Sequence, residues 1–137
     1  MSQHAYHKMR ICIVSDPDIV QKTLQSFLTD LGHDVISVTV SELREYLEHH
    51  TKPIHLAIIP QHIEKPLLQE FHHKHPETMI ALLNGSRCLL STDEALDYGV
   101  YTFLHTPIHF NELEVLLIRL AQYYTHKGDS RRLPFDV

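Results

Sequence analysis

The chain has 137 residues, enough for one domain with a substantial core, and its 43% apolar and 21% charged residues are typical of a globular protein. The net charge is −5 with neutral histidines and no basic stripe is present, which argues against nucleic acid as the main partner. No apolar run approaches the roughly 20 residues of a transmembrane helix, and the first ten residues lack the apolar middle of a secretory signal. The two cysteines form no disulfide framework. We therefore expect a cytoplasmic protein without membrane contact.

The first predicted unit is a short strand followed by an amphipathic helix. The stretch "RICIV" (10–14) is apolar after Arg10, as expected for a short strand buried on both faces. Asp16 and Pro17 then predict a helix start, because Asp is a good N-cap and Pro fits the first helical turn. Apolar residues recur at three- and four-residue spacing as far as Leu31, and Gly32 is expected to end the helix.

Two further units follow the same order. Residues 34–40 predict the second strand, and Ser41 is the expected N-cap of a helix that stops before Pro53. Residues 54–59 predict the third strand, whose apolar run leads into a helix that ends before His75.

The remaining two units complete the domain. Residues 78–83 predict the fourth strand and residues 92–98 a short helix. Residues 101–105 predict the fifth strand, and the last helix is expected over 110–124. Residues 126–137 are polar and break the pattern, so we expect a tail or linker there.

Strict alternation of strand and helix predicts an α/β fold with a parallel sheet. Right-handed crossovers leave few arrangements, and five units of this size fit a flavodoxin-like (βα)5 doubly wound sheet with strand order 2-1-3-4-5. We expect a single domain over residues 9–125, preceded by a flexible N-terminus at residues 1–8.

Four stretches, in the right order, resemble a response-regulator receiver domain over about residues 9 to 125. They are "ICIVSDPD", "LGHDV", "HLAII" and "DYGVYTFLHTPIHFNEL". The resemblance implies bacterial-type two-component signalling. Receivers place an acid pair after the first strand, a phosphoacceptor Asp at the end of the third, a Thr or Ser after the fourth, and a Lys before the proline that follows the fifth. Together these groups bind Mg²⁺ and hold a phosphoryl group on the Asp.

The positions that match the acid pair and the acceptor have lost most of this chemistry. The acid pair reads Ser15 and Asp16, and the acceptor position holds Pro60. Aspartyl phosphorylation needs a carboxylate nucleophile, and proline offers none. Asp16 is the one carboxylate left as a Mg²⁺ ligand at this pocket, and we expect it to serve as the cap of the first helix instead.

The positions that match the hydroxyl and the lysine differ as well. They hold Asn84 and Thr106, with Pro107 retained. We therefore predict a pseudo-receiver that keeps the fold, has no catalytic residue, is not an enzyme and needs no cofactor. Phe103 matches the switch aromatic of receivers, and without a phosphoryl group we expect it to be an interaction or core residue that does not switch.

Two alternatives stay open at this point. One is a flavodoxin-like protein that binds FMN, a nucleotide or another small ligand, although the sequence has neither a P-loop nor a Gly-x-Gly-x-x-Gly motif. The other is a receiver phosphorylated at a displaced acidic residue, with Asp16 and Glu64 as the first suspects.

Thirteen histidines are present, and two groups of them suggest a metal site. His49-His50 and "HHKH" (72–75) fall at the expected C-terminal ends of the second and third helices. Imidazolium groups complement the helix dipole there, and their spacing matches no standard zinc pattern, so we expect exposed side chains and no metal. Protonation of all thirteen would change the net charge from −5 to +8, so acid should alter the protein's electrostatics sharply.

The last helix carries more apolar residues than one buried face requires. A stripe at three- and four-residue spacing should face the sheet; it comprises Leu113, Leu116, Leu117, Leu120 and Tyr124. Val115 and Ile118 fall on the opposite side, with Phe103 and Tyr123 at the flank. We predict that this face binds a protein partner, a signalling protein or an attached output domain, or forms a homodimer. Receivers often pair through the corresponding elements. The other interpretation is that residues 126–137 cover these side chains.

Overall fold

The computed structural model describes five strands and five helices that alternate along the chain. The described residues are 8–15, 19–49, 52–84, 92–105 and 108–127. In chain order the elements are β1 (Arg10–Val14), α1 (Ile19–Asp30), β2 (Asp34–Val38), α2 (Val40–His49), β3 (Leu56–Pro60), α3 (Lys65–Lys74), β4 (Met79–Asn84), α4 (Thr92–Asp97), β5 (Val100–His105) and α5 (Phe110–Lys127).

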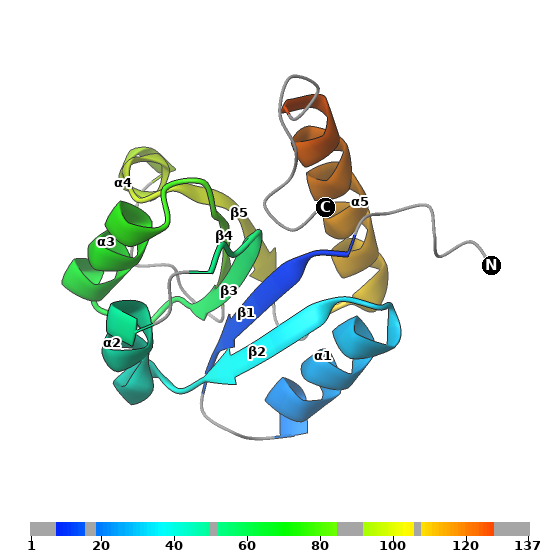
Figure 1. Ribbon diagram of the computed structural model, residues 1–137, viewed down its shortest axis with the longest axis horizontal. Coiled ribbons are helices and arrows are strands. Elements are labelled where there is room, and N and C mark those ends of the chain that lie inside the picture. The colour runs from blue at the N-terminus through cyan, green and yellow to red at the C-terminus, as the bar shows by residue number, and fades with distance from the viewer. Residues whose placement is uncertain (1–7, 16–18, 50–51, 85–91, 106–107, 128–137) are drawn as a thin grey trace.

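The strands form one parallel sheet in the order β2-β1-β3-β4-β5, which confirms the predicted topology. Helices α1 and α5 lie on one face of the sheet, and α2, α3 and α4 lie on the other (Figure 1). The inner strands therefore bury both of their faces, and β3, all of whose residues are buried, is the clearest unbroken apolar run, whereas the edge strands β2 and β5 are only partly buried.

Alternate side chains of the strands supply two separate cores. In β1, Ile11 and Ile13 belong to the cluster with α1 and α5, whereas Cys12 and Val14 belong to the cluster with α2, α3 and α4. Successive side chains of a strand point to opposite faces, so this division follows directly from the pleat. Cys12 is fully buried in the second of these clusters, where it packs as a small hydrophobic residue.

The start of α2 differs from the sequence-based expectation. The second strand ends at Val38 rather than at residue 40, and Thr39 rather than Ser41 is the N-cap. Thr39 Oγ1 accepts the backbone N–H of Glu42 at 3.2 Å, and Glu42 Oε1 accepts the N–H of Thr39 at 3.0 Å. This reciprocal pair is a capping box, which satisfies two backbone donors and therefore starts the helix two residues earlier.

Two other boundaries also moved. The third strand begins at Leu56 rather than at residue 54, although Ile54 is buried directly before it. Helix α5 continues to Lys127, three residues beyond the expected end and two residues into the expected tail. The apolar stripe stops at Tyr124, but the next residue of low helix propensity is Gly128, so nothing in the sequence ends the helix sooner.

The register of α5 agrees with the prediction. The five residues of the expected stripe are all buried against the sheet, whereas Val115 and Ile118 are exposed. At its start the helix is joined to α1 by the stacked rings of Phe27 and Phe110, whose centroids are 4.3 Å apart. Within the described part of the chain, no helix is both long enough and apolar enough to span a bilayer.

Candidate functional site

Pro60 is the last residue of β3 and lies buried at the carboxyl edge of the sheet. It pairs with Leu83 of β4, and the next backbone N–H, that of Gln61, donates to the Leu83 carbonyl at 3.0 Å. Successive N–H groups of a strand alternate in direction, so an N–H at position 60 would point toward β1. In the register of β1 with β3, such an N–H would face the Val14 carbonyl, and the pairing of the two strands ends at Ile13 and Ile58, a pair that needs no donor at residue 60.

The other described positions of the predicted pocket lie at the same edge. Ser15 directly follows β1, and its N–H donates to the Val38 carbonyl at 3.0 Å, which joins the ends of β1 and β2. Asn84 is the last residue of β4 and pairs with His105, the last residue of β5. Parallel topology thus brings the matching positions together at the edge where ligands bind in open α/β sheets.

The remaining pocket positions, Asp16, Thr106 and Pro107, lie outside the described residues. Among the side chains that are described at this edge, Ser15, Pro60 and Gln61 supply no carboxylate. An acyl phosphate forms only on a carboxylate nucleophile, so none of these three can accept a phosphoryl group in that form.

Gln61 is a polar residue of this edge that sequence reasoning did not single out. Its Oε1 is buried and has no hydrogen-bond partner among the described residues. Only its position directly after Pro60 could have marked it as a pocket residue, because a glutamine in a turn is not in itself a sign of a functional site.

Glu64, the suspected displaced acceptor, is exposed at the N-cap of α3 and makes no side-chain capping hydrogen bond.

A second candidate surface lies on the elements that end the chain. Every large apolar side chain that is markedly exposed in the described residues belongs to α4, β5 or α5. They are Leu96 (66% exposed), Tyr101 (43%), Phe110 (37%), Val115 (48%), Ile118 (42%) and Tyr123 (38%). Exposed apolar residues scattered singly mean little, but their gathering on neighbouring elements marks a candidate contact surface.

A groove of about 330 Å³ runs between β5 and α5. Its walls are Tyr101, Thr102, Phe103 and Leu104 on the strand and Glu112, Val115, Leu116 and Arg119 on the helix. We call this groove, together with Ile118 and Tyr123, the β5–α5 face. β5 is an edge strand of the sheet, and α5 is its neighbour in space (Figure 1).

Phe103 contacts both the core and the groove. Its side chain is half-buried and packs against the core cluster on the side of α2, α3 and α4, yet it also lines the groove beside Val115.

Leu96 and Tyr101 are exposed apolar residues that the sequence analysis did not single out. Tyr101 is exposed because of a register shift: Val100 pairs with Ile80 but Thr102 pairs with the next residue of β4, which leaves Tyr101 as the extra residue of a bulge.

The expectation that the histidines of α3 are exposed is wrong for two of them. His73 is exposed, but His72 is half-buried against Gly99, and His75 is only 8% exposed. His75 is the C-cap of α3, where its ring packs against Phe71 with centroids 5.4 Å apart, and burial lowers its pKa.

Metal ligands do not converge in the described structure. No group of three or more His, Cys, Asp or Glu side chains within it is placed to hold a metal ion. His49 instead makes a contact of 3.0 Å between its Nδ1 and the carbonyl of Glu45 within α2, while His50 lies outside the described residues.

The geometry of the sheet and its helices is similar to that of solved receiver structures. A CheY-like response regulator receiver domain protein from Methanospirillum hungatei JF-1 has a TM-score of 0.75 at 20% identity, covering 89% of this chain and all of the other. NtrX from Brucella abortus has a TM-score of 0.73 at 18% identity, and the match covers 88% of this chain but 28% of NtrX.

A third structure is the co-crystal of the Saccharomyces cerevisiae histidine phosphotransfer signaling protein Ypd1 with the receiver domain of its downstream response regulator Ssk1. A chain of it has a TM-score of 0.66 at 18% identity, covering 85% of this chain and 91% of that one. No protein-family model matches the sequence, and no curated protein does. The structural similarity, together with the strand order, shows that this chain has the fold of a CheY-like response-regulator receiver domain.

Proposed function

We propose that this chain is a pseudo-receiver: a signalling module that is not phosphorylated on aspartate and that acts by binding a protein through its β5–α5 face. The observation that carries the proposal is Pro60 at the end of β3, the position at which a receiver needs its acceptor carboxylate. Proline ends β3 beyond the last pair with β1 and has no carboxylate that could take a phosphoryl group, which supports the proposal.

The surface that would then carry the signal is the β5–α5 face. Val115 and Ile118 are about half exposed there, beside a groove that Phe103 partly fills. Burial of such side chains on association contributes roughly 25 cal/mol per Å² of apolar area. A receiver domain bound to another protein is found in the Ypd1–Ssk1 co-crystal, which supports protein binding as the mode of action.

A second copy of this chain is the partner that the surface fits most directly. Glu112 and Arg119 lie in the same groove as Val115, so the face presents both charge signs beside its apolar residues. A two-fold dimer brings one patch against itself, and an acidic and a basic group on that patch allow each copy to pair with the other.

The test is self-association of a charged variant of the face. Val115→Glu with Ile118→Lys should leave the circular dichroism spectrum unchanged, because both side chains are exposed, and should reduce the sedimenting mass from dimer to monomer. The matched control is Ser26→Glu with Thr29→Lys, which introduces the same charges at the same spacing on exposed positions of α1. The control should sediment as the parent does.

Two results would contradict this part of the proposal. One is a charged variant that associates as strongly as the parent, which would place the contact on another surface. The other is a parent chain that stays monomeric at every concentration, which would exclude a second copy as the partner.

A further inference from the structure

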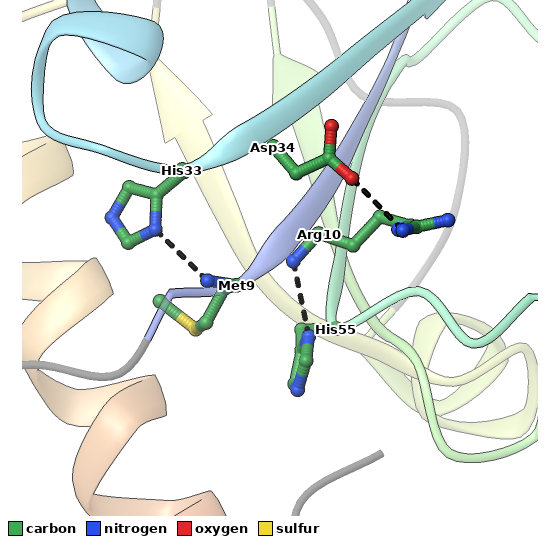
Figure 2. Close-up of polar contacts among 5 residues, drawn as sticks. All are labelled: Met9, Arg10, His33, Asp34 and His55. Atoms are coloured by element: carbon green, nitrogen blue, oxygen red, sulfur yellow. Dashed lines mark hydrogen bonds and ion pairs between the residues drawn. The ribbon is translucent and has the colours of Figure 1, made fainter. Parts of the chain in front are cut away.

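Two buried histidines bind the backbone at the start of β1. His33 lies in the turn between α1 and β2, and His55 lies directly before β3; their side chains are 5% and 1% exposed. The N–H of Met9 donates to His33 Nδ1 at 3.1 Å, and the N–H of Arg10 donates to His55 Nδ1 at 3.1 Å (Figure 2). A backbone N–H can only donate, so Nδ1 of each ring accepts, and each neutral ring carries its proton on Nε2.

The two rings extend the hydrogen-bond ladder of the sheet at its amino edge. The carbonyl of Met9 accepts the N–H of Asp34 at 2.9 Å, and the carbonyl of Arg10 accepts the N–H of His55 at 2.9 Å. Figure 2 shows the rings on opposite sides of β1, one on the side of β2 and one on the side of β3. The Nδ1 atoms of the two rings thus accept backbone N–H groups that a strand carbonyl would accept in a regular sheet. These two hydrogen bonds hold the start of β1 to the segments that precede β2 and β3.

The same edge also holds the far end of α5. The ring of Tyr124 packs edge-on against the His55 ring, with centroids 4.8 Å apart and an interplanar angle of 87°. The Tyr124 hydroxyl lies 2.8 Å from the backbone carbonyls of both His55 and Glu77. Through Tyr124, the segment that holds His55 therefore positions the C-terminal end of α5 on the sheet.

The charges around the rings do not favour a cation there. The titratable and charged groups that face them are Arg10, Asp34, Lys74, His75, Glu77 and Tyr124. The Asp34 carboxylate is already paired with the Arg10 guanidinium at 2.9 Å. Glu77 and Lys74, which have opposite charges, both line a hollow of about 200 Å³ beside His55. Burial lowers the pKa of His33.

We propose that His33 and His55 form a proton-sensitive latch, which holds the start of β1 to β2 and β3 while both rings are neutral and releases it, together with the C-terminal half of α5, when they are protonated. Protonation turns Nδ1 from an acceptor into a donor that faces another donor, and it places a charge in a buried site. The inference does not rest on the proposed function, although the half of α5 that the latch would release also carries Tyr123 of the β5–α5 face.

The direction of the pH dependence follows from the number of protons bound. In the open form the rings meet water and titrate near the ordinary pKa of about 6.5, whereas the closed form keeps them neutral. The open form binds more protons below about pH 6.5, so acid shifts the equilibrium toward opening. Opening should increase about tenfold per pH unit for one ring and up to about 100-fold per unit for both, and it should level off only below the pKa of the closed form.

Amide hydrogen exchange measures this opening directly. The full chain is compared from about pH 7.5 to 5.5, with exchange at β1 and at the end of α5 corrected for the intrinsic effect of pH on the exchange rate. The test variant is His33→Asn with His55→Asn, because the amide oxygen of Asn can accept at the place of Nδ1 and does not titrate. This variant should keep the protection of β1 and of the end of α5 from exchange, and its opening should lose the steep dependence on pH.

A matched variant, His62→Asn with His73→Asn, removes two exposed histidines and should keep the parent's pH dependence. The proposal is overturned if the parent shows no increase in opening below pH 6.5, or if the His33/His55 variant keeps it. If that variant does not fold, imidazole ¹H–¹⁵N spectra of the parent give the answer. Both rings should be neutral with the proton on Nε2, and a ring protonated on Nδ1 in the folded protein would overturn the latch.

Discussion

Gly99 offers a quantitative test of how α3 packs against the turn into β5. Its φ is +81°, a conformation that side chains with a Cβ rarely adopt. A Cβ added there would lie 2.7 Å from Cε1 and 3.2 Å from Cγ of His72, both closer than ordinary van der Waals contact. The left-handed backbone costs about 1–2 kcal/mol and overpacking a further 1–3 kcal/mol, so Gly99→Ala should lower the free energy of unfolding by about 2–5 kcal/mol.

The backbone and steric parts of this loss can be separated by two further variants. Gly32 also has positive φ, +99°, but an added Cβ there meets nothing within 4 Å. Gly32→Ala should therefore show only the backbone part, about 1–2 kcal/mol. In the double variant Gly99→Ala with His72→Ala the steric part should disappear, giving a coupling energy of about 1–3 kcal/mol.

Urea denaturation followed by circular dichroism gives the free energies of unfolding of the parent, of these three variants and of His72→Ala alone, which the coupling energy requires, provided that the m-value is unchanged. The reasoning would be refuted if Gly99→Ala cost no more than Gly32→Ala. It would equally be refuted if removing the His72 ring left the cost of Gly99→Ala unchanged, because the strain would then not come from that contact.

Three other predictions concern single residues. Tyr124→Phe should lower the free energy of unfolding by about 1–3 kcal/mol in urea denaturation, because it removes the hydroxyl that lies within hydrogen-bond distance of the His55 and Glu77 carbonyls at the buried amino edge. An unchanged midpoint would contradict these contacts. Thr39→Ala should lower it by about 1 kcal/mol through loss of the capping bond to Glu42, whereas Ser41→Ala should have little effect. Burial raises the pKa of the Cys12 thiol to about 12, so peptide mapping after iodoacetamide treatment should find Cys12 labelled in urea but not in the folded protein.

The sequence was informative where one local signal decided the structure. Short apolar stretches predicted the five strands, their alternation with helices predicted the strand order, and the spacing of apolar residues predicted the buried stripe of α5. The N-cap of α2 was misplaced because both Thr39 and Ser41 can cap a helix. The deciding signal was Glu42, three residues after Thr39, which completes a capping box and was available in the sequence.

Other features depend on contacts between distant segments and could not be predicted. His75 is buried because its ring packs on Phe71, and a histidine at a helix end is otherwise expected in water. Tyr101 is exposed through a bulge that depends on the pairing of β5 with β4. His33 and His55 gave no signal in the sequence, because their role follows from the backbone of β1, 24 and 45 residues away.

At the candidate pocket, the identities of the residues could be read from the sequence, whereas their common edge follows from the fold. Pro60 was predicted at the end of the third strand and is found there. The sequence did not indicate that this proline would lie beyond the last residue pair of β3 with β1.

The measurement that tests the central claim most directly is the intact mass of the purified chain after incubation with acetyl phosphate and Mg²⁺. The pseudo-receiver proposal predicts no added phosphoryl group, and it predicts none for Pro60→Asp either, because that change restores the nucleophile without the lysine and second acid of a receiver. A receiver domain with an intact pocket, treated in parallel, should gain one group. A stoichiometric phosphoryl adduct on the parent chain would contradict the proposal and would point to a displaced acceptor, with Asp16 and Glu64 the first positions to map.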